Sequence, residues 1–177
     1  DYKNEQHKGA LSELAGGAMN QDGRSASLTA PNGPAQVAVI KEALRRGGMS
    51  ACEVAFVEAH GTGTNLGDPI EVGALAREFK GDEGGRREDG GSPNPVIPVV
   101  IGSIKGNFGH AEAAAGVVGV SRTINTIQRG RATGIGNLQR VSDRVAKAAA
   151  GVLAFPMETM ALTPRSEGEA AGRLVAG

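Results

Sequence analysis

Aromatic side chains are scarce in this sequence of 177 residues and make up 3% of it. Platforms that stack nucleic-acid bases need several such rings, so this kind of binding is excluded. The 19 basic and 19 acidic residues balance, and no overall field favours nucleic acid or an anionic membrane. No apolar stretch approaches the ~20 residues of a membrane span, and the amino terminus lacks the apolar core of a signal peptide.

Cysteine is almost absent as well. The single residue of this type, Cys52, cannot form an internal disulfide and is compatible with a reducing compartment. Nothing in its flanking sequence would activate the thiol, so we expect it to be inert. These absences together predict a soluble protein of the cytoplasm, or of an organelle such as a plastid.

Glycine, in contrast, is abundant, with 28 residues. Part of it lies in two histidine-containing motifs, where the backbone must turn sharply or approach a ligand. The rest lies in the segment 81–91 and in the last third of the chain, where it indicates flexible chain. Only the first group is expected to serve function.

Alternating strand and helix patterns predict an α/β layered fold. Apolar runs at 54–57 and 96–101 are typical of buried strands, although Pro98 indicates an irregular or edge position in the second. Helical periodicity follows Pro34 up to Gly47, returns at 68–79 and returns again at 111–129. The sequence shows no internal repeat.

Two of these helices carry clear apolar stripes. In the helix at 68–79, Asp68 is placed as the cap, Pro69 as the first helical residue and Glu71 as the partner in a capping box. Its expected buried residues are Val72, Leu75, Ala76 and Phe79. The helix at 111–129 has small residues in its first turns, which favour close packing against another element. Its expected buried residues are Val117, Val120, Ile124 and Ile127.

The chain divides into three parts. Residues 1–9 are polar and are expected to form a loose end. Residues 10–140 form the core, with a short strand expected near 10–19 and a mobile loop at 80–95, where charge and glycine show no periodicity. Residues 141–177 have few apolar anchors, so we expect an irregular tail that stops before the final strands of the fold.

Two histidines follow apolar strands in glycine-rich segments. His60 begins a turn in which Gly61 and Gly63 leave Thr62 open on both sides, and Thr64 adds a second hydroxyl. These neutral donors and acceptors suit a long, amide-containing arm better than a bare phosphate. His110 lies in the second segment, and the two imidazoles are expected to converge at one edge of the sheet. Such a pair suits catalysis, although no nucleophile accompanies it.

Other interpretations of these residues remain open. A histidine after a strand can be purely structural. A dinucleotide site is disfavoured because Gly61, Gly63 and Gly67 are spaced one residue too widely and Asp68 would repel a pyrophosphate. A metal site is disfavoured because the two histidines lack paired-ligand spacing. Lys105 can be a surface cation, or an ammonium that pairs with a carboxylate and orders the loop carrying His110.

The motifs resemble those of a known family. Segments 58–71 and 105–116 resemble the two histidine motifs of β-ketoacyl synthases, which are the ketosynthase domains of polyketide and fatty acid synthases. Segments 19–25 and 28–36 resemble the opening of the carboxyl-terminal half in type I polyketide synthases. The resemblance covers roughly residues 10–140 and implies a partial thiolase-like fold.

The resemblance also implies an activity, namely decarboxylative Claisen condensation of a malonyl thioester with an acyl chain held on a cysteine. By position, His60 and His110 would be the catalytic histidines and Lys105 the supporting lysine, and Glu112 and Asn107 would assist them. The turn formed by Gly61, Thr62, Gly63 and Thr64 would contact the phosphopantetheine arm of an acyl carrier protein. No cofactor or metal ion would be bound directly. The implied partners are the carrier protein, the amino-terminal ketosynthase half and a second copy in a homodimer.

The sequence departs from the family pattern in three ways. The cysteine motif of the amino-terminal half and the glycine-rich segment near the carboxyl end are missing, and Cys52 lies on the wrong segment to replace the nucleophile. Gly106 stands where a serine is common. Segment 134–138 is a loose version of a proline-containing one. We therefore expect most of a carboxyl-terminal half that is inactive alone. The alternative is a non-catalytic thiolase-like module that binds a ketosynthase or a carrier protein.

Overall fold

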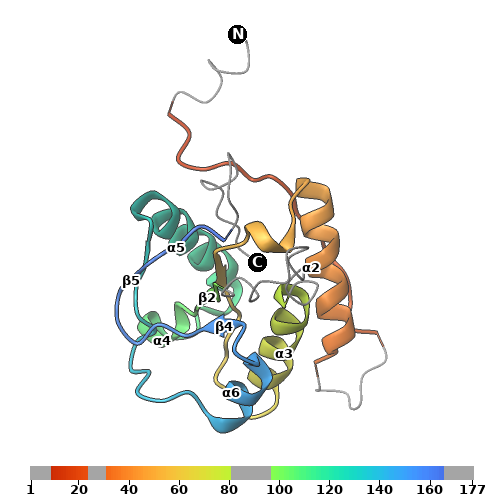
Figure 1. Ribbon diagram of the computed structural model, residues 1–177, viewed down its shortest axis with the longest axis vertical. Coiled ribbons are helices and arrows are strands. Elements are labelled where there is room, and N and C mark those ends of the chain that lie inside the picture. Colours follow the sequence, from red (N-terminus) through yellow and green to blue (C-terminus); the bar gives the residue numbers. More distant parts are fainter. Residues whose placement is uncertain (1–8, 24–30, 81–96, 166–177) are drawn as a thin grey trace, which may run out of the picture.

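The computed structural model describes residues 9–23, 31–80 and 97–165 (Figure 1). The loop expected at 80–95 lies outside this part of the chain, apart from Lys80, and so do the first eight residues of the expected loose end. The segment expected as a strand near 10–19 has no regular structure and is largely exposed, so that prediction is wrong. Its scattered apolar residues pair with none of the strands in the described part of the chain.

A parallel three-stranded sheet forms the centre of the molecule, in the order β1-β2-β4. Its strands are β1 (Phe56–Glu58), β2 (Val99–Gly102) and β4 (Leu153–Ala154). Because β2 lies between the other two, the expected edge position is wrong. Pro98 is tolerated because it precedes the first paired residue, so its missing N–H removes no bond from the ladder.

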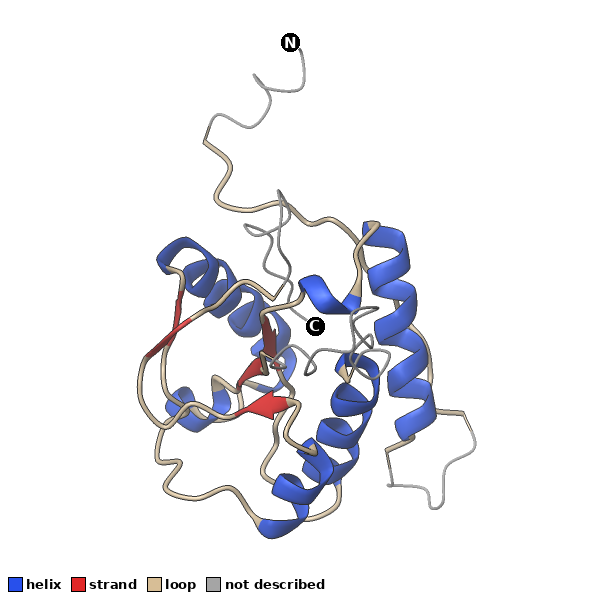
Figure 2. Cartoon of the chain, in the orientation of Figure 1, coloured by secondary structure: helices blue, strands red, loops and turns tan. Residues whose placement is uncertain are grey.

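Helices cover both faces of this sheet (Figures 1 and 2). Val57, Val99 and Ile101 point to the face covered by α2 and α3, while Phe56 and Val100 point to the opposite face. On that opposite face lie α5 and a small antiparallel ribbon of β3 (Arg131–Ala132) and β5 (Met160–Ala161). The helices are α2 (Gly33–Gly47), α3 (Gly67–Phe79), α4 (Lys105–Phe108), α5 (Ala115–Arg129) and α6 (Asp143–Ala149).

Helices α2 and α3 follow their sequence patterns closely. Asn32 caps α2 by accepting the N–H of Ala35, and Gly48 ends it in the left-handed conformation with φ of 61°. The expected stripe of α3 is confirmed, because its four apolar residues are all buried in the main core. None of the helices in the described ranges is long and apolar enough to cross a membrane.

The most buried face of helix α5 is not the face that its apolar stripe indicated. Val117 and Val120 are 70% and 59% exposed, so their predicted burial is wrong. The side chains of Arg122, Thr123 and Thr126 are buried instead, against the sheet and the ribbon. The first half of the apolar face is therefore open to solvent, over the same turns that carry the small residues, whereas Ile124 and Ile127 are half-buried.

The carboxyl-terminal segment is more regular than expected. Helix α6 packs on α3, and β4 completes the sheet, with Val152 and Leu153 buried. The 3-10 turn η1 (Ala51–Glu53) leads into β1. The Arg165 guanidinium anchors the end of the described chain by donating to the carbonyl oxygens of Ile97, Ala51, Val54 and Phe79. The expected irregular tail is thus wrong for residues 143–165, because backbone pairing and this arginine replace the missing apolar pattern.

Candidate functional site

The two histidines meet at one edge of the sheet. His60 follows β1 and His110 follows β2 and α4, and their ring centroids are 5.5 Å apart with the rings at 88° to each other. β1 and β2 are parallel neighbours, so the segments that leave their carboxyl ends come together. The predicted convergence is confirmed, and the distance is short enough for both imidazoles to contact one small reacting group.

The turn after His60 is held by two carboxylates of α3. Glu71 accepts the N–H of His60 at 2.6 Å and that of Gly61 at 2.9 Å. Asp68 accepts the N–H of Gly63 at 3.1 Å and that of Thr64 at 3.3 Å. The predicted capping box is therefore wrong, since both acids bind the preceding turn instead of the ends of their own helix. The turn gains a fixed shape from charged acceptors, which form the stronger class of hydrogen bond.

A threonine hydroxyl binds the first N–H of α3, although the N-cap residue itself is Leu66. Thr64 Oγ1 accepts the N–H of Gly67 at 3.0 Å, which places this hydroxyl at the helix terminus. Gly61 has φ of +46°, and a Cβ there would lie 2.6 Å from Ser103 Oγ, so only glycine fits. Gly63 has φ of +77° and open space around it. Thr62 lies between these glycines and is exposed, as the sequence predicted.

Backbone contacts set the orientation of the second histidine. His110 Nδ1 accepts the N–H of Glu112 at 2.9 Å. A neutral imidazole that accepts at Nδ1 carries its proton on Nε2, so the free nitrogen is a hydrogen-bond donor. Glu112 has φ of 47°, which is rare for a residue with a side chain. The contribution of Glu112 seen here comes from its backbone.

The other predicted residues surround this pair. Lys105 is half-buried at the start of α4, and within the described residues no ion pair joins it to Glu112. Asn107 ties α4 to the segment after β3, because its amide donates to Gly134 O at 3.4 Å and its oxygen accepts the N–H of Gly136 at 3.2 Å. Asn107 thus holds the loop that presents His110.

A buried ion pair joins the end of β1, two residues before His60, to α5, and the sequence analysis did not predict it. Glu58 Oε2 is 2.9 Å from Arg122 Nη1, and each side chain is 5% exposed. Burial raises the pKa of Glu58 above its ordinary value, while the N–H of Ile104, the Arg122 charge and the Lys105 charge oppose this rise. The sequence did contain one indication that Arg122 is buried. It shares a face of α5 with Gly119 and Thr126, and small or hydroxyl residues at these positions leave room for the arginine to pack inward.

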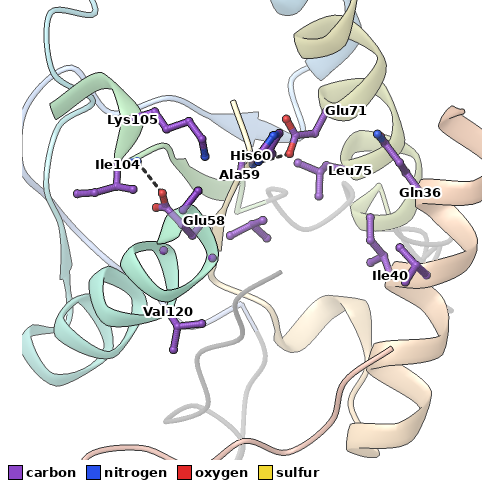
Figure 3. Close-up of a pocket in the computed structure, with 15 residues that line it drawn as sticks. Gln36, Ile40, Glu58, Ala59, His60, Glu71, Leu75, Ile104, Lys105 and Val120 are labelled. Carbon is purple, nitrogen blue, oxygen red and sulfur yellow. Dashed lines mark hydrogen bonds between the residues drawn. The ribbon is translucent and has the colours of Figure 1, made fainter. Parts of the chain in front are cut away.

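A cavity of about 440 Å³ opens beside the site (Figure 3). His60, Glu71 and Lys105 form its polar rim, and the Gln36 side chain from α2 also faces it. The Gln36 Oε1 atom is buried and has no hydrogen-bond partner within the described residues. The apolar wall consists mainly of Ile40, Leu75, Gly116, Gly119 and Val120.

Loss of the Glu71 carboxylate is expected to loosen the turn of His60. In Glu71→Ala, hydrogen exchange at the amides of His60 and Gly61 should accelerate roughly 10- to 100-fold, because hydrogen bonds to charged groups contribute ~1.5–3 kcal/mol. Exchange measured by NMR tests this. Glu78→Ala on the same helix is the control, since Glu78 pairs only with Lys41, at 3.8 Å, within the described residues. Unchanged protection at His60 in Glu71→Ala would contradict the assigned role.

The comparison with protein families agrees with this arrangement. A family model described as the beta-ketoacyl synthase, C-terminal domain matches residues 11–139. The chain belongs to the β-ketoacyl synthase family and represents part of the carboxyl-terminal portion of a ketosynthase domain. The resemblance stated from the motifs is thereby confirmed.

Similar proteins are polyketide synthases. The chain is 50% identical over 121 residues to spectinabilin polyketide synthase system protein NorA′ of Streptomyces orinoci, covering 68% of this chain and 3% of that protein. It is 50% identical over 120 residues to erythronolide synthase EryA3 of Saccharopolyspora erythraea, covering 68% of this chain and 4% of that protein. The chain therefore spans only a small fraction of these relatives.

Solved ketosynthase domains share the fold. The oxazolomycin ketosynthase domain OzmH KS7 of Streptomyces albus JA3453 matches with a TM-score of 0.75 at 29% identity, covering 94% of this chain and 27% of that one. The ketosynthase from module 6 of the bacillaene synthase of Bacillus subtilis 168 gives a TM-score of 0.75 at 26% identity, covering 96% and 28%. The predicted thiolase-like layered fold, present in part, is confirmed.

Proposed function

We propose that this chain supplies the two histidines of a decarboxylative Claisen condensation in polyketide or fatty acid biosynthesis. The observation that carries the proposal is the contact of His60 with His110, whose ring centroids are 5.5 Å apart beside a cavity. In this reaction a malonyl thioester loses carbon dioxide to give an enolate, whose carbon attacks an acyl thioester. The new carbon–carbon bond forms as the thiolate leaves.

The chemistry needs donors aimed at developing negative charge. An enolate and a tetrahedral oxyanion both place charge on oxygen, and preorganised donors stabilise that charge in a site protected from water. The Nε2–H of His110 is such a donor, because its Nδ1 is already occupied by the Glu112 amide. His60 is held from its backbone by Glu71 and would provide the second contact. Lys105 would add positive charge at the rim.

The turn after His60 would receive the phosphopantetheine arm of an acyl carrier protein. The hydroxyl and backbone groups of Thr62 and the C=O group of Gly63 would offer neutral donors and acceptors suited to the amides of this arm, whereas the N–H groups of Gly61 and Gly63 already donate to Glu71 and Asp68. Thr64 would contribute mainly through its hydroxyl proton, since Oγ1 accepts from Gly67 and the backbone N–H and C=O of Thr64 already bond to Asp68. Asn107 and Glu112 would act by holding the His110 loop.

The acyl-bearing thiol would come from the amino-terminal ketosynthase half. The exposed face of α5, with Val117, Val120 and the small residues Gly116 and Ala115, forms an apolar surface that this half would cover. The intact enzyme is expected to be a homodimer. A non-catalytic module that binds a ketosynthase or carrier protein would present the same apolar surface, so activity must decide between the two functions.

A chimera tests the proposal. Residues 11–139 of this chain would replace the matching segment in erythronolide synthase EryA3, to which the chain is 50% identical. Loading of the acyl group on the cysteine of the host shows that the chimera folds, and mass spectrometry then follows carbon dioxide release and the β-ketoacyl product. We expect both to occur. A chimera that is acylated but neither decarboxylates nor condenses would contradict the enzymatic function and favour the binding module.

A further inference from the structure

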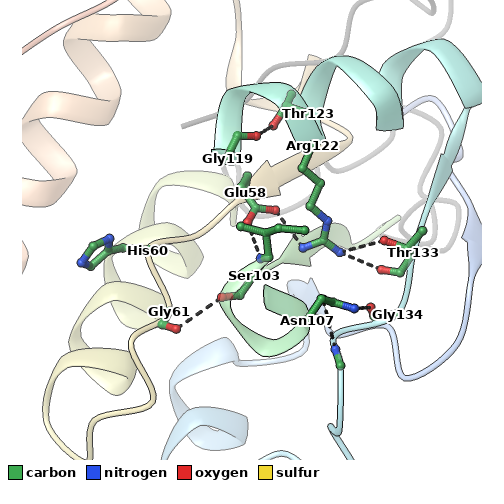
Figure 4. Close-up of polar contacts among 12 residues, drawn as sticks. Glu58, His60, Gly61, Ser103, Asn107, Gly119, Arg122, Thr123, Thr133 and Gly134 are labelled. Atoms are coloured by element: carbon green, nitrogen blue, oxygen red, sulfur yellow. Dashed lines mark hydrogen bonds and ion pairs between the residues drawn. The ribbon is translucent and has the colours of Figure 1, made fainter. Parts of the chain in front are cut away.

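The buried ion pair behind the histidines links four separate segments (Figure 4). Glu58 ends β1, immediately before the turn of His60, and its Oε1 accepts the N–H of Ile104 at 2.6 Å. Ile104 is the residue from which α4 starts. Arg122 on α5 bonds the other carboxylate oxygen through Nη1, and its Nη2 donates to Thr133 O at 2.8 Å and to Thr133 Oγ1 at 3.2 Å. One carboxylate thus joins the strand of His60 to the loop of His110.

Two glycines make room for this pair. A Cβ at Gly102 would lie 2.6 Å from Glu58 Oε2 and 2.9 Å from Arg122 Nη1, closer than real Cβ contacts allow. A Cβ at Gly119 would lie 3.3 Å from Glu58 Cγ. The Arg122 guanidinium carbon also lies 6.0 Å from the centroid of the Phe56 ring. Glycine at these two positions therefore provides the space that the Glu58 and Arg122 side chains occupy.

Stability alone is a weak explanation for such an arrangement. Two charges lose their hydration on burial, and a buried ion pair can often be replaced by apolar residues without loss of stability. Arg122 Nε, moreover, is buried without a hydrogen-bond partner in the described part of the chain. What an apolar pair could not supply is the fixed, directional contact between the end of β1 and Ile104. Geometry at the histidines is the property that depends on this contact.

We propose that Glu58 and Arg122 are positioning residues that set the placement of His60 relative to His110. Glu58 fixes the spacing between the two histidine-bearing segments through the Ile104 amide, and Arg122 fixes the orientation of the Glu58 carboxylate. Arg122 in turn is held by Thr133. The consequence for turnover rests on the proposed condensation, whereas the geometric statement does not.

The double variant Glu58→Leu with Arg122→Met tests the geometry in the full chain. Both side chains are replaced by apolar ones, so circular dichroism should show an intact fold. NMR should show loss of the cross-peak between the two imidazole rings, and the Ile104 amide should exchange roughly 10- to 100-fold faster once its charged acceptor is removed. A folded double variant that keeps the cross-peak and the Ile104 protection would overturn the proposal.

Glu58→Gln decides the question if the double variant does not fold. Ile104 and Arg122 donate to different oxygens of Glu58, and in glutamine one of these positions becomes an NH2 group, which would face a donor and cannot accept from it. We expect a weaker histidine cross-peak and faster exchange at Ile104 or at Arg122 Nη1. Unchanged values would overturn the proposal. Glu42→Gln on α2 is the matched control, because Glu42 is paired with Arg45 and Arg46 on the exposed surface.

Turnover in the chimera separates this inference from the proposed function. Glu58→Leu with Arg122→Met should lower the condensation rate while leaving acylation of the host cysteine intact. If the histidine cross-peak is lost and condensation continues unchanged, the catalytic role of the histidines fails and the positioning role stands. If the cross-peak survives in the folded variant, the positioning role fails whatever the rate.

Discussion

Mixed alone with acyl- and malonyl-loaded carrier protein, the 177-residue chain is expected to give no β-ketoacyl product and no stable acyl-enzyme. Acyl transfer requires a thiolate beside a base or a helix terminus. The one thiol, Cys52, is exposed on η1, with its sulfur 2.9 Å from Ser50 Oγ. η1 leads into the start of β1, whereas both histidines lie beyond the carboxyl ends of β1 and β2. Cys52 is thus at the wrong end of the strand.

Mass spectrometry of the product and of the intact protein checks this expectation. Adding the amino-terminal half of a ketosynthase in trans should give acylation and then condensation, because under the proposed function that half would bring the thiol and would cover the exposed face of α5. The Cys52→Ala variant is the control. If the chain alone forms product and the Cys52→Ala variant still does so, a nucleophile other than Cys52 was overlooked. If the Cys52→Ala variant forms no product, Cys52 is the nucleophile.

Replacement of either histidine by alanine is expected to reduce the condensation rate of the chimera strongly. His110→Ala should lower the condensation rate roughly 100- to 1,000-fold, as removal of one preorganised oxyanion donor does elsewhere. His60→Ala should have an effect of similar size, since the two rings contact the same small volume. The loss should fall on kcat, because the histidines bind charge that develops during the reaction.

Acylation of the host cysteine provides the internal reference for these variants. It should remain within a few-fold of the unsubstituted chimera, because it does not require decarboxylation. Arg77→Ala, at an exposed position of α3, is the surface control. A condensation rate that is unaffected in both histidine variants would refute the assignment of the pair, even though the rings are in contact.

Local patterns predicted the framework of the site well. The stripe of α3 and the strands before each histidine were apparent because each element buries a face that its own sequence marks. Convergence of His60 and His110 followed from the general placement of sites in parallel sheets. The roles of Glu71 and Asp68 could not be predicted from the sequence, because both residues fit a helix-capping pattern. In the structure they accept N–H groups of the turn after His60, and this depends on how the turn folds back onto α3.

Helix α5 shows where periodicity misleads. Val117 and Val120 on its apolar face are exposed, and the described chain packs through Arg122 and two threonines instead. A single sequence shows which residues are apolar, but it does not show which other part of the protein packs against them. The prediction of an irregular carboxyl-terminal tail was wrong for a different reason. β4 and Arg165 are held by hydrogen bonds to backbone groups, and such bonds leave no pattern in the sequence.

The contact between α4 and the segment after β3 constrains how this sequence can change over generations. A Cβ at Gly106 would lie 2.9 Å from Ile135 Cγ2 and 3.0 Å from Gly136 O, so a side chain there requires this segment to move. A Cβ at Gly136 would in turn overlap the Gly106 carbonyl. Gly106 and Gly136 are thus coupled through the close approach of the two backbones. A substitution at either glycine therefore calls for a compensating shift in the other segment, and the order in which such changes arise decides whether the intermediate folds.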